Sequence, residues 1–282
     1  MHILPVEKPL RLQNNGSLEI VFIGVGSAFT KTLYNTNLII IKGDTHVLVD
    51  FGTTGPFSLP ATTGLELGDI EYLLPTHSHC DHIGGIEPIG LWNRYVAVPF
   101  MKKKKLTMLI TEEYQNILWN MSLRGGMEWN EMTSEGQALR FTDYFDVIRP
   151  KAISMLPRPH FIVELDNLRL ELFATNHIPE QALDANSAFL SYGVMIDDRV
   201  LYSGDTKFDP TILEQYGSRA ECIFHDTSFT PNPVHASLPE LHTLDAAMKE
   251  KMYLVHYGDS HANIDVSDFA GLGQQGVRYI FD

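Results

Sequence analysis

Three stretches of the chain consist of two β-rich arms joined by a short polar turn, which is the pattern of a β-hairpin. The arms of the second stretch alternate between apolar and polar residues with a period of two, as a strand with one buried face does. The three predicted hairpins cover Asn37 to Asp50 with Lys42-Gly43-Asp44 at the turn, His160 to Phe173 with Asp166-Asn167 at the tip, and Ala188 to Tyr202 with Asp197-Asp198 at the turn.

Single apolar runs add further strands, at Leu18 to Gly24 and at Ile70 to Leu74. Residues Glu112 to Met121 have helical character, and Arg124-Gly125-Gly126 is expected to end that helix. Many short strands separated by helical segments predict an α/β sandwich in which helices cover two sheets. No linker rich in proline, glycine or serine divides the chain, so we expect one domain over residues 1–282, with a variable helical or loop insertion around 111–150.

Composition narrows the class of protein. An apolar content of 44% over 282 residues indicates a packed globular protein, and the formal net charge of −14 makes long nucleic acids unlikely partners, because phosphate contacts need clustered Lys and Arg. The two cysteines, Cys80 and Cys222, do not form a disulfide scaffold, and no run reaches the length of a membrane span. We therefore expect a cytoplasmic protein without a membrane partner.

The segment Thr76-His77-Ser78-His79-Cys80-Asp81-His82-Ile83-Gly84-Gly85 carries the strongest chemical signal. It follows the predicted strand that ends at Leu74, and its two glycines allow a sharp turn into a helix. Its three imidazoles and one carboxylate are ligands that two adjacent divalent metal ions accept. Burying four ionisable groups this close together without a cation would be costly, so a metal site is the preferred interpretation.

This HxHxDH motif resembles that of the metallo-β-lactamase fold superfamily of metallohydrolases. The resemblance continues in family order along nearly the whole chain. Phe22 to Ala28 resembles the opening strand and turn, His177 the histidine of the third motif, Asp205 the bridging aspartate, and His256 the last histidine.

The resemblance implies an αββα sandwich of two mixed sheets covered by helices, with two divalent metal ions, Zn²⁺ or alternatively Mn²⁺. It assigns one ion to His77, His79 and His177, and the other to Asp81, His82 and His256, with Asp205 bridging both. It also places Asp81 among the catalytic residues and Cys80 at a spacer position. A water or hydroxide held by such a pair would attack the substrate.

Two further segments resemble signatures of the ribonuclease Z branch. They are His225-Asp226-Thr227-Ser228-Phe229 and His235-Ala236-Ser237. Carried over, His235 is the general acid or the donor to the scissile phosphate, and Asp226 orients it. His225 is interpreted as structural. The acidic position holds Asp where the branch has Glu, and His-Ala-Ser replaces His-Ser-Thr.

The chain lacks a Gly/Pro-rich basic arm of the kind that ribonuclease Z uses to grip tRNA. The region from His235 to His256 resembles the cyclic-nucleotide phosphodiesterases of this fold, a group that includes phage enzymes that destroy cyclic-nucleotide defence signals. The predicted substrate is therefore a small phosphodiester, above all a cyclic nucleotide. The alternatives are a tRNA 3′-end endonuclease, a thioesterase or lactonase of the same fold, and a catalytically dead scaffold, against which the intact ligand set argues.

Two surface features leave alternatives open. Lys102 to Lys105 is interpreted as a solvated turn, with a phosphate-attracting patch at the pocket mouth as the alternative. An apolar cluster in the insertion is interpreted as core, with a dimer contact or a substrate-covering flap as the alternative; because ribonuclease Z-like proteins are typically homodimers, we expect a homodimer. The cluster consists of Trp119, Met121, Met127, Trp129 and Met132.

Overall fold

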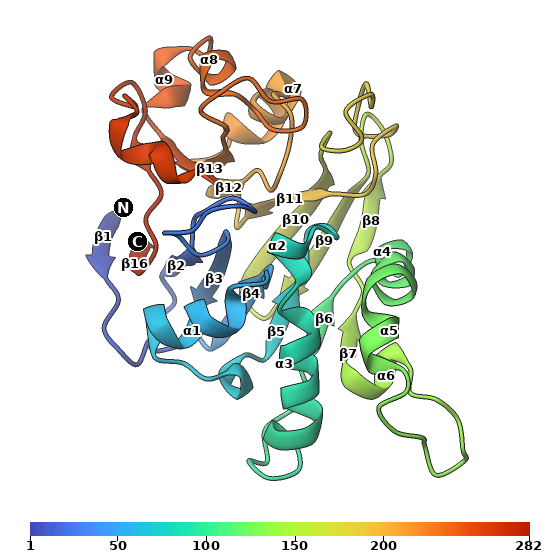
Figure 1. Ribbon diagram of the computed structural model, residues 1–282. Coiled ribbons are helices and arrows are strands. Elements are labelled where there is room, and N and C mark those ends of the chain that lie inside the picture. Colours follow the sequence, from blue (N-terminus) through green and yellow to red (C-terminus); the bar gives the residue numbers. More distant parts are fainter. The chain divides into compact units, whose positions relative to one another are not determined.

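The computed structural model describes all 282 residues and divides the chain into two compact units (Figure 1). Unit 1 comprises residues 1–24, 37–150 and 276–282, and unit 2 comprises residues 25–36 and 151–275. Each unit contains one eight-stranded sheet. The single domain predicted over residues 1–282, with its insertion, stays a prediction.

The sheet of unit 1 is mixed. Its strand order is β1-β16-β2-β3-β4-β5-β6-β7, antiparallel from β1 to β4 and parallel from β4 to β7. The strands are β1 (His2–Pro5), β2 (Leu18–Gly24), β3 (Asn37–Lys42), β4 (Thr45–Val49), β5 (Tyr72–Leu74), β6 (Thr107–Leu109), β7 (Asp146–Ile148) and β16 (Val277–Phe281).

The centre of this sheet follows from its sequence. Strand β2 is buried at every position, and β3 is buried at all but its last, as apolar β-branched runs that are covered on both faces should be. The predicted hairpin is confirmed, since Lys42 of β3 pairs with Thr45 of β4 around a glycine at φ 59°. The chain ends meet at the sheet edge, where β1 pairs with β16 (Figure 1).

Short helices accompany this sheet, and α1 packs on β2. The helical segments of unit 1 are α1 (Gly55–Thr63), η1 (Leu67–Asp69), α2 (Cys80–Ile83), α3 (Ile86–Trp92), η2 (Asn93–Ala97), α4 (Glu112–Ile117), η3 (Leu118–Leu123), α5 (Arg124–Met127) and α6 (Phe141–Tyr144).

One expectation for the region 111–150 is wrong. The helix that Thr111 caps does not end at Arg124-Gly125-Gly126, because helical structure continues through α5. Gly126 lies within this helix, close to the side chain of Glu87. A Cβ at this position would lie 2.2 Å from a carboxylate oxygen of Glu87 on α3.

The apolar cluster of this region is divided between core and surface. Met127 is fully buried, and the Trp119 ring lies 6.1 Å from that of Phe141. The side chains of Met121, Trp129 and Met132 are each more than 60% exposed. The core interpretation therefore holds for only part of the cluster, and the exposed part is apolar surface.

The sheet of unit 2 has the order β15-β14-β13-β12-β11-β10-β9-β8, antiparallel from β8 to β12 and parallel from β12 to β15. Both remaining hairpins are confirmed, with turns at Asp166-Asn167 and around Asp197-Asp198. The strands are β8 (Lys151–Ser154), β9 (His160–Leu165), β10 (Leu168–Ala174), β11 (Tyr192–Ile196), β12 (Val200–Tyr202), β13 (Cys222–Asp226), β14 (Met252–Val255) and β15 (Gly271–Leu272).

Helices α7, α8 and α9 lie beside strands β12 and β13 (Figure 1). They share a hydrophobic core with the sheet, in which Phe173, Leu201, Ile223 and Leu254 are buried against Leu241. The helical segments of unit 2 are α7 (Pro210–Ile212), η4 (Leu213–Gly217), α8 (Leu238–Leu241), α9 (Ala246–Lys249) and η5 (Asp259–Asn263). None of the helices of the chain has the length and apolar character needed to span a bilayer.

Candidate metal centre

The HxHxDH motif occupies the loop after β5 and the single turn of α2 in unit 1. The turn of α2 ends at Gly84, where a Cβ would lie 2.6 Å from the carbonyl oxygen of Cys80, and α3 begins two residues later. The imidazoles converge, since the ring centroid of His77 lies 4.7 Å from that of His79 and 4.1 Å from that of His82. The predicted strand-loop-helix geometry is thus present, and it gathers the four expected ligands of this unit.

Asp50 contacts the candidate ligand His82, and the sequence analysis missed it. It directly follows β4, is fully buried, and accepts hydrogen bonds from the backbone N–H of Thr76 at 2.7 Å and from its hydroxyl at 2.8 Å. Its carboxylate also lies 2.7 Å from Nδ1 of His82. Burial raises the pKa of Asp50, against the opposing effect of His82. The signal available in the sequence was an Asp directly after the apolar run of a predicted strand.

The candidate site residues of unit 2 come from four separate strand ends. His177 follows β10, Asp205 follows β12, Asp226 ends β13, and His256 follows β14. Because β12, β13 and β14 are parallel, their carboxyl ends meet at one edge of the sheet. The loop that carries His235 reaches the same place.

Asp205 is at the centre of this group. Its Oδ2 lies 3.8 Å from Nε2 of His177 and 3.4 Å from Nε2 of His256. Four side chains of unit 2 each offer a ligand atom within 4.8 Å of the others, namely Asp205, Asp226, His235 and His256. The side chains of all four are at least four-fifths buried, and electrostatic interactions among them are therefore stronger than they would be in water.

The hydrogen bonds that Nδ1–H donates fix the tautomers of the candidate ligand histidines. Nδ1 of His177 lies 2.8 Å from the carbonyl oxygen of Val234, which can only accept, so the lone pair of this imidazole is on Nε2. Nδ1 of His77 lies 3.1 Å from the Thr76 hydroxyl, whose own proton goes to Asp50. The same logic holds for His82 beside Asp50. Such partners orient the ring and raise its basicity toward a metal.

His235 and Asp226 form a buried ion pair. Nδ1 of His235 lies 2.8 Å from Oδ2 of Asp226, which also accepts from the backbone N–H of Thr206 at 3.0 Å. Burial lowers the pKa of His235, but the carboxylates of Asp226 and Asp205 outweigh burial and raise it above its ordinary value. The pKa of Asp226 moves down, since His235 outweighs burial. Both shifts favour a protonated imidazole.

His225 is next to Asp226 in the chain, but it contacts the backbone of Asp226 and not its carboxylate. It is fully buried, and its Nδ1 lies 2.7 Å from the backbone carbonyl oxygen of Asp226. Burial lowers its pKa, so the ring is neutral. These contacts agree with the structural role expected from the sequence.

The backbone is strained where the strands deliver these groups. Asp50 and His256 both have φ of 61°, a left-handed conformation that residues with a Cβ rarely adopt. Gly204, which precedes Asp205, has φ of 57°, and a Cβ there would lie 2.3 Å from the carbonyl oxygen of Tyr192. At Asp50 and His256 the left-handed residue itself carries the side chain that leaves the sheet edge, and at Gly204 the next residue, Asp205, carries it.

The donors present fit divalent metal ions. They are imidazole nitrogens with assigned lone pairs and carboxylate oxygens, which is the set that zinc and manganese accept. Within unit 1 the structure gathers His77, His79, Asp81 and His82, and within unit 2 it gathers His177, Asp205 and His256, with the His235–Asp226 pair beside them. The assignment of individual residues to particular ions stays a prediction. Cys80 is exposed, in keeping with a spacer position.

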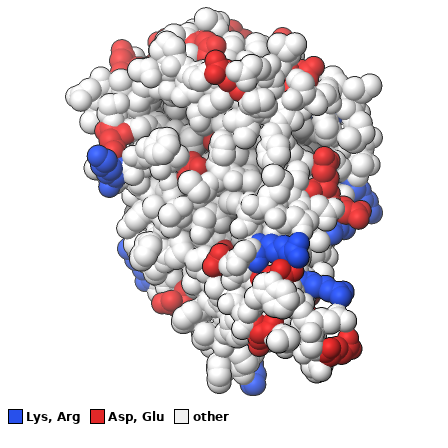
Figure 2. Space-filling model, turned by 45° about the vertical axis from the view of Figure 1, so that its right-hand side comes forward, with Lys and Arg blue, Asp and Glu red and all other residues white.

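The lysine run does not form an unpaired cationic patch. Lys103 lies 3.0 Å from Asp69, Lys104 lies 3.0 Å from Glu71, and Lys105 lies 2.8 Å from Asp146. On the face drawn in Figure 2, Lys and Arg lie apart from one another with Asp and Glu between them. The pairing supports the solvated-turn interpretation of these lysines and offers little to a polyanion.

Comparison with known proteins agrees with this geometry. The family of "Anti-Pycsar protein Apyc1" matches residues 18–279. The protein of that name from Bacillus phage 010DV004 is 32% identical over 250 residues, covering 86% of this chain and 90% of the relative. The one from Paenibacillus xerothermodurans is 34% identical over 247 residues, covering 86% and 89%.

Solved structures show the fold. The metallo-β-lactamase fold protein YhfI from Bacillus subtilis has a TM-score of 0.66 at 13% identity, over 94% of this chain and 99% of its own. The short form of human tRNase Z has a TM-score of 0.61 at 13% identity, over 94% and 99%. The predicted metallo-β-lactamase fold of two mixed sheets with helices is confirmed. The chain is a metal-dependent hydrolase, and it belongs to the Anti-Pycsar protein Apyc1 family.

Proposed function

We propose that the chain hydrolyses a cyclic nucleotide at a centre that holds two divalent metal ions, zinc or manganese. The observation that carries this proposal is the His235–Asp226 pair beside Asp205, because it adds a positioned proton donor to a set of metal ligands. Its membership of the Anti-Pycsar protein Apyc1 family and its sequence resemblance to cyclic-nucleotide phosphodiesterases support the choice of substrate.

The ligand residues of both units are proposed to serve the same pair of ions. One ion would be held by His77, His79 and His177, the other by Asp81, His82 and His256, with Asp205 shared. Two divalent ions supply an activated water and positive charge for the developing phosphate oxyanion. The buried carboxylates of Asp50 and Asp226 hold ligand histidines in orientation from behind.

His235 is proposed to protonate the departing sugar oxygen. Its Nδ1–H donates to Asp226, which leaves the Nε2–H as the proton available for transfer. The carboxylates raise its pKa and so favour the protonated imidazole that a general acid needs. A sugar alkoxide is a poor leaving group, so the transferred proton is what makes the ring opening of a cyclic phosphodiester fast. Asp226 keeps the imidazole in place during the transfer.

The other candidates are less well supported. A tRNA endonuclease needs a basic surface, but the chain has a net charge of −14 and its lysine run is paired with carboxylates. A thioesterase expels a thiolate, which is a better leaving group than a sugar alkoxide, so it has no need for a protonated His235 held by Asp226. The intact ligand set opposes a dead scaffold.

A substrate panel tests the proposal. Protein loaded with Zn²⁺ or Mn²⁺ is assayed against 3′,5′-cyclic and 2′,3′-cyclic mononucleotides, cyclic dinucleotides, precursor tRNA, a thioester and a lactone. We expect hydrolysis of a cyclic nucleotide with kcat/KM at least about 10³-fold above that for the thioester and lactone. Cleavage of precursor tRNA alone, or of the acyl substrates alone, would contradict it.

We further propose a homodimer in the cytoplasm. The exposed side chains of Met121, Trp129 and Met132 support an apolar contact surface, since methionine and tryptophan are enriched at interfaces and rare on free surfaces.

A further inference from the structure

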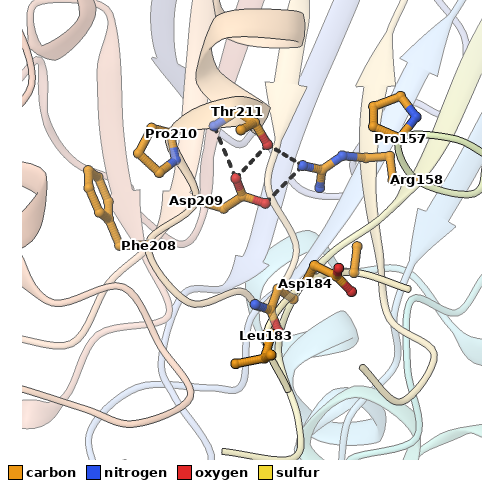
Figure 3. Close-up of a pocket in the computed structure, with 10 residues that line it drawn as sticks. Pro157, Arg158, Leu183, Asp184, Phe208, Asp209, Pro210 and Thr211 are labelled. Carbon is orange, nitrogen blue, oxygen red and sulfur yellow. Dashed lines mark hydrogen bonds and ion pairs between the residues drawn. The ribbon is translucent and has the colours of Figure 1, made fainter. Parts of the chain in front are cut away.

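Unit 2 contains a cavity of about 380 Å³ that no step of the proposed reaction uses (Figure 3). It is formed by segments that directly adjoin metal ligands along the chain. Asn176 precedes His177, and Phe208 lies three residues after Asp205. The two segments are tied together, because the backbone N–H of Lys207 donates to the carbonyl oxygen of Asn176 at 2.8 Å. A group bound in this cavity would therefore lie next to the reacting centre.

The polar side of the cavity is formed by buried side chains that hydrogen bonds hold in place. The Arg158 side chain is only 6% exposed, and its guanidinium donates to Asp209 at 2.9 Å, to the Ala174 carbonyl at 2.8 Å and to Thr211 (Figure 3). Its Nε–H has no hydrogen-bond partner, and neither has the buried Oδ1 of Asn176. Leaving a buried donor and a buried acceptor unsatisfied is costly, so the wall is complementary to a ligand with both an N–H donor and a hydrogen-bond acceptor.

The remaining wall is apolar and incompletely covered. The Phe208 ring is half-buried, and Leu183 at the rim is 91% exposed. The loop that carries Leu183 is held in place by Lys207, whose Nζ donates to the carbonyl oxygens of Pro179, Glu180 and Ala182 at 3.1, 2.8 and 2.8 Å. A flat ring inserted beside Phe208 would cover apolar surface that water now contacts.

We propose that this cavity binds the base of the nucleotide substrate, with Phe208 as the stacking residue and Asn176 as the acceptor for a base N–H. This assignment rests on the proposed function. A phosphate group is a poor alternative because the charge of Arg158 is already matched by Asp209, and a lipid chain is a poor alternative because of the polar wall. Every common base offers an N–H donor, so the cavity selects for the presence of a base and not for one base.

The test compares two substrates with the same scissile bond. One is a cyclic mononucleotide, and the other is 1-deoxyribose 3′,5′-cyclic phosphate, which lacks the base. The metal-loaded parent protein should bind the nucleotide more tightly, with a KM about tenfold lower, as stacking of one base provides. Phe208→Ala should remove most of this preference by raising the KM for the nucleotide alone, and kcat should not change.

Because Phe208 also packs against the core of unit 2, a second variant guards against a folding defect. Leu183→Ala alters only an exposed rim residue and should raise the nucleotide KM about two- to threefold, since a smaller apolar area is lost. Phe57→Ala, at a phenylalanine of α1 in unit 1 that is 70% exposed, is the matched control and should leave both KM values unchanged.

The outcomes separate the two proposals. If the parent protein hydrolyses the nucleotide and both variants keep its full preference over the baseless substrate, the base assignment is wrong and the proposed function stands. If the parent protein hydrolyses neither substrate, the proposed function is wrong and the base assignment is overturned with it. A KM increase that is equal for both substrates would also overturn the base assignment, because it would show a general disturbance of the site.

Discussion

The two sets of candidate ligands are built in different ways. In unit 1 they occupy six consecutive positions, His77 to His82, in one loop and one helical turn. In unit 2 they lie at the ends of separate strands, from His177 to His256, and the register of β12, β13 and β14 brings the last of them together. The local set depends on one buried carboxylate, Asp50, whereas the dispersed set depends on the packing of a whole sheet.

This difference determines how each set should fail when it is changed. A local ligand set tolerates changes in the surrounding core, but it loses orientation when its supporting carboxylate is removed. A dispersed ligand set contains its own central carboxylate, Asp205, from which three histidines lie within 4 Å. The variants below test whether the centre depends more on unit 2 than on unit 1, from the largest expected effect to the smallest.

Asp205→Ala should have the largest effect. It removes the carboxylate proposed to be shared by both ions and leaves the imidazoles of unit 2 without their central anion. We expect hydrolysis to fall to background, at least about 10⁴-fold, and the metal content measured by elemental analysis to fall from about two equivalents per chain to below one. Retention of two equivalents and of activity would show that Asp205 is not a bridging ligand.

His235→Ala should lower turnover of a cyclic nucleotide by about 10²- to 10⁴-fold, the usual contribution of one acid–base group. Metal content and fold should be kept. The loss should shrink for a p-nitrophenyl phosphodiester, whose leaving group needs little protonation, and Asp226→Asn should show the same pattern more weakly. Steady-state kinetics with both substrates measure this, and equal losses on the two would refute a general-acid role.

Asp50→Asn tests the set of unit 1. The substitution keeps the shape of the side chain but weakens its acceptance of the hydrogen bond from His82, so the imidazole loses basicity and orientation. Metal affinity should fall about 10- to 100-fold, as it does when the partner of a ligand histidine is changed, while activity at saturating metal falls less. Metal titration followed by calorimetry measures the affinity. Asp44→Asn, at the exposed hairpin turn, is the control and should have no effect.

The smallest effect concerns stability and pH. Burial lowers the pKa of His177 to about 4, so between pH 6.5 and about 4 the unfolded chain binds a proton there that the folded chain does not. The metal-free protein should therefore lose roughly 3 kcal/mol of stability through this residue as the pH falls across that window, and no more below it.

Urea unfolding of the metal-free protein at pH 7 and pH 4.5 checks this pH dependence. His177→Asn keeps a donor for the Val234 carbonyl but cannot be protonated, so the difference in stability between the two pH values should be smaller than in the parent protein. His2→Asn, at the exposed chain start, is the control. An unchanged pH dependence in His177→Asn would show that folding does not lower the pKa of His177.

The contrast between the two sets also explains what the sequence could reveal. His77, His79, Asp81 and His82 are so close in the chain that their spacing alone brings their side chains together. This part of the site could therefore be predicted without a structure. His177, Asp205 and His256 needed a resemblance, because nothing in the local sequence states which strand ends meet. The hairpin turns were predictable since polar residues such as Asp197 tolerate the left-handed conformation that the turns require.

The errors and omissions have a common physical cause in tertiary contact. Gly126 was expected to end a helix, but it lies within α5, next to Glu87 of α3. Asp50 looked like the end of a hairpin arm, and its role depends on Thr76 and His82, more than twenty residues away. The cavity beside Phe208 is likewise formed by side chains from four segments, so the sequence of any one segment does not predict it.

The left-handed backbone at Asp50 and His256 has a consequence for how the chain can evolve. Each conformation costs roughly 1 kcal/mol relative to glycine at the same position. A library selected only for thermal resistance should therefore enrich glycine at position 256, because glycine adopts this conformation without strain. A library selected for hydrolysis should retain histidine there. Thermostabilised lineages of this family, unless they are kept under selection for turnover, should lose their chemistry first at the ends of strands.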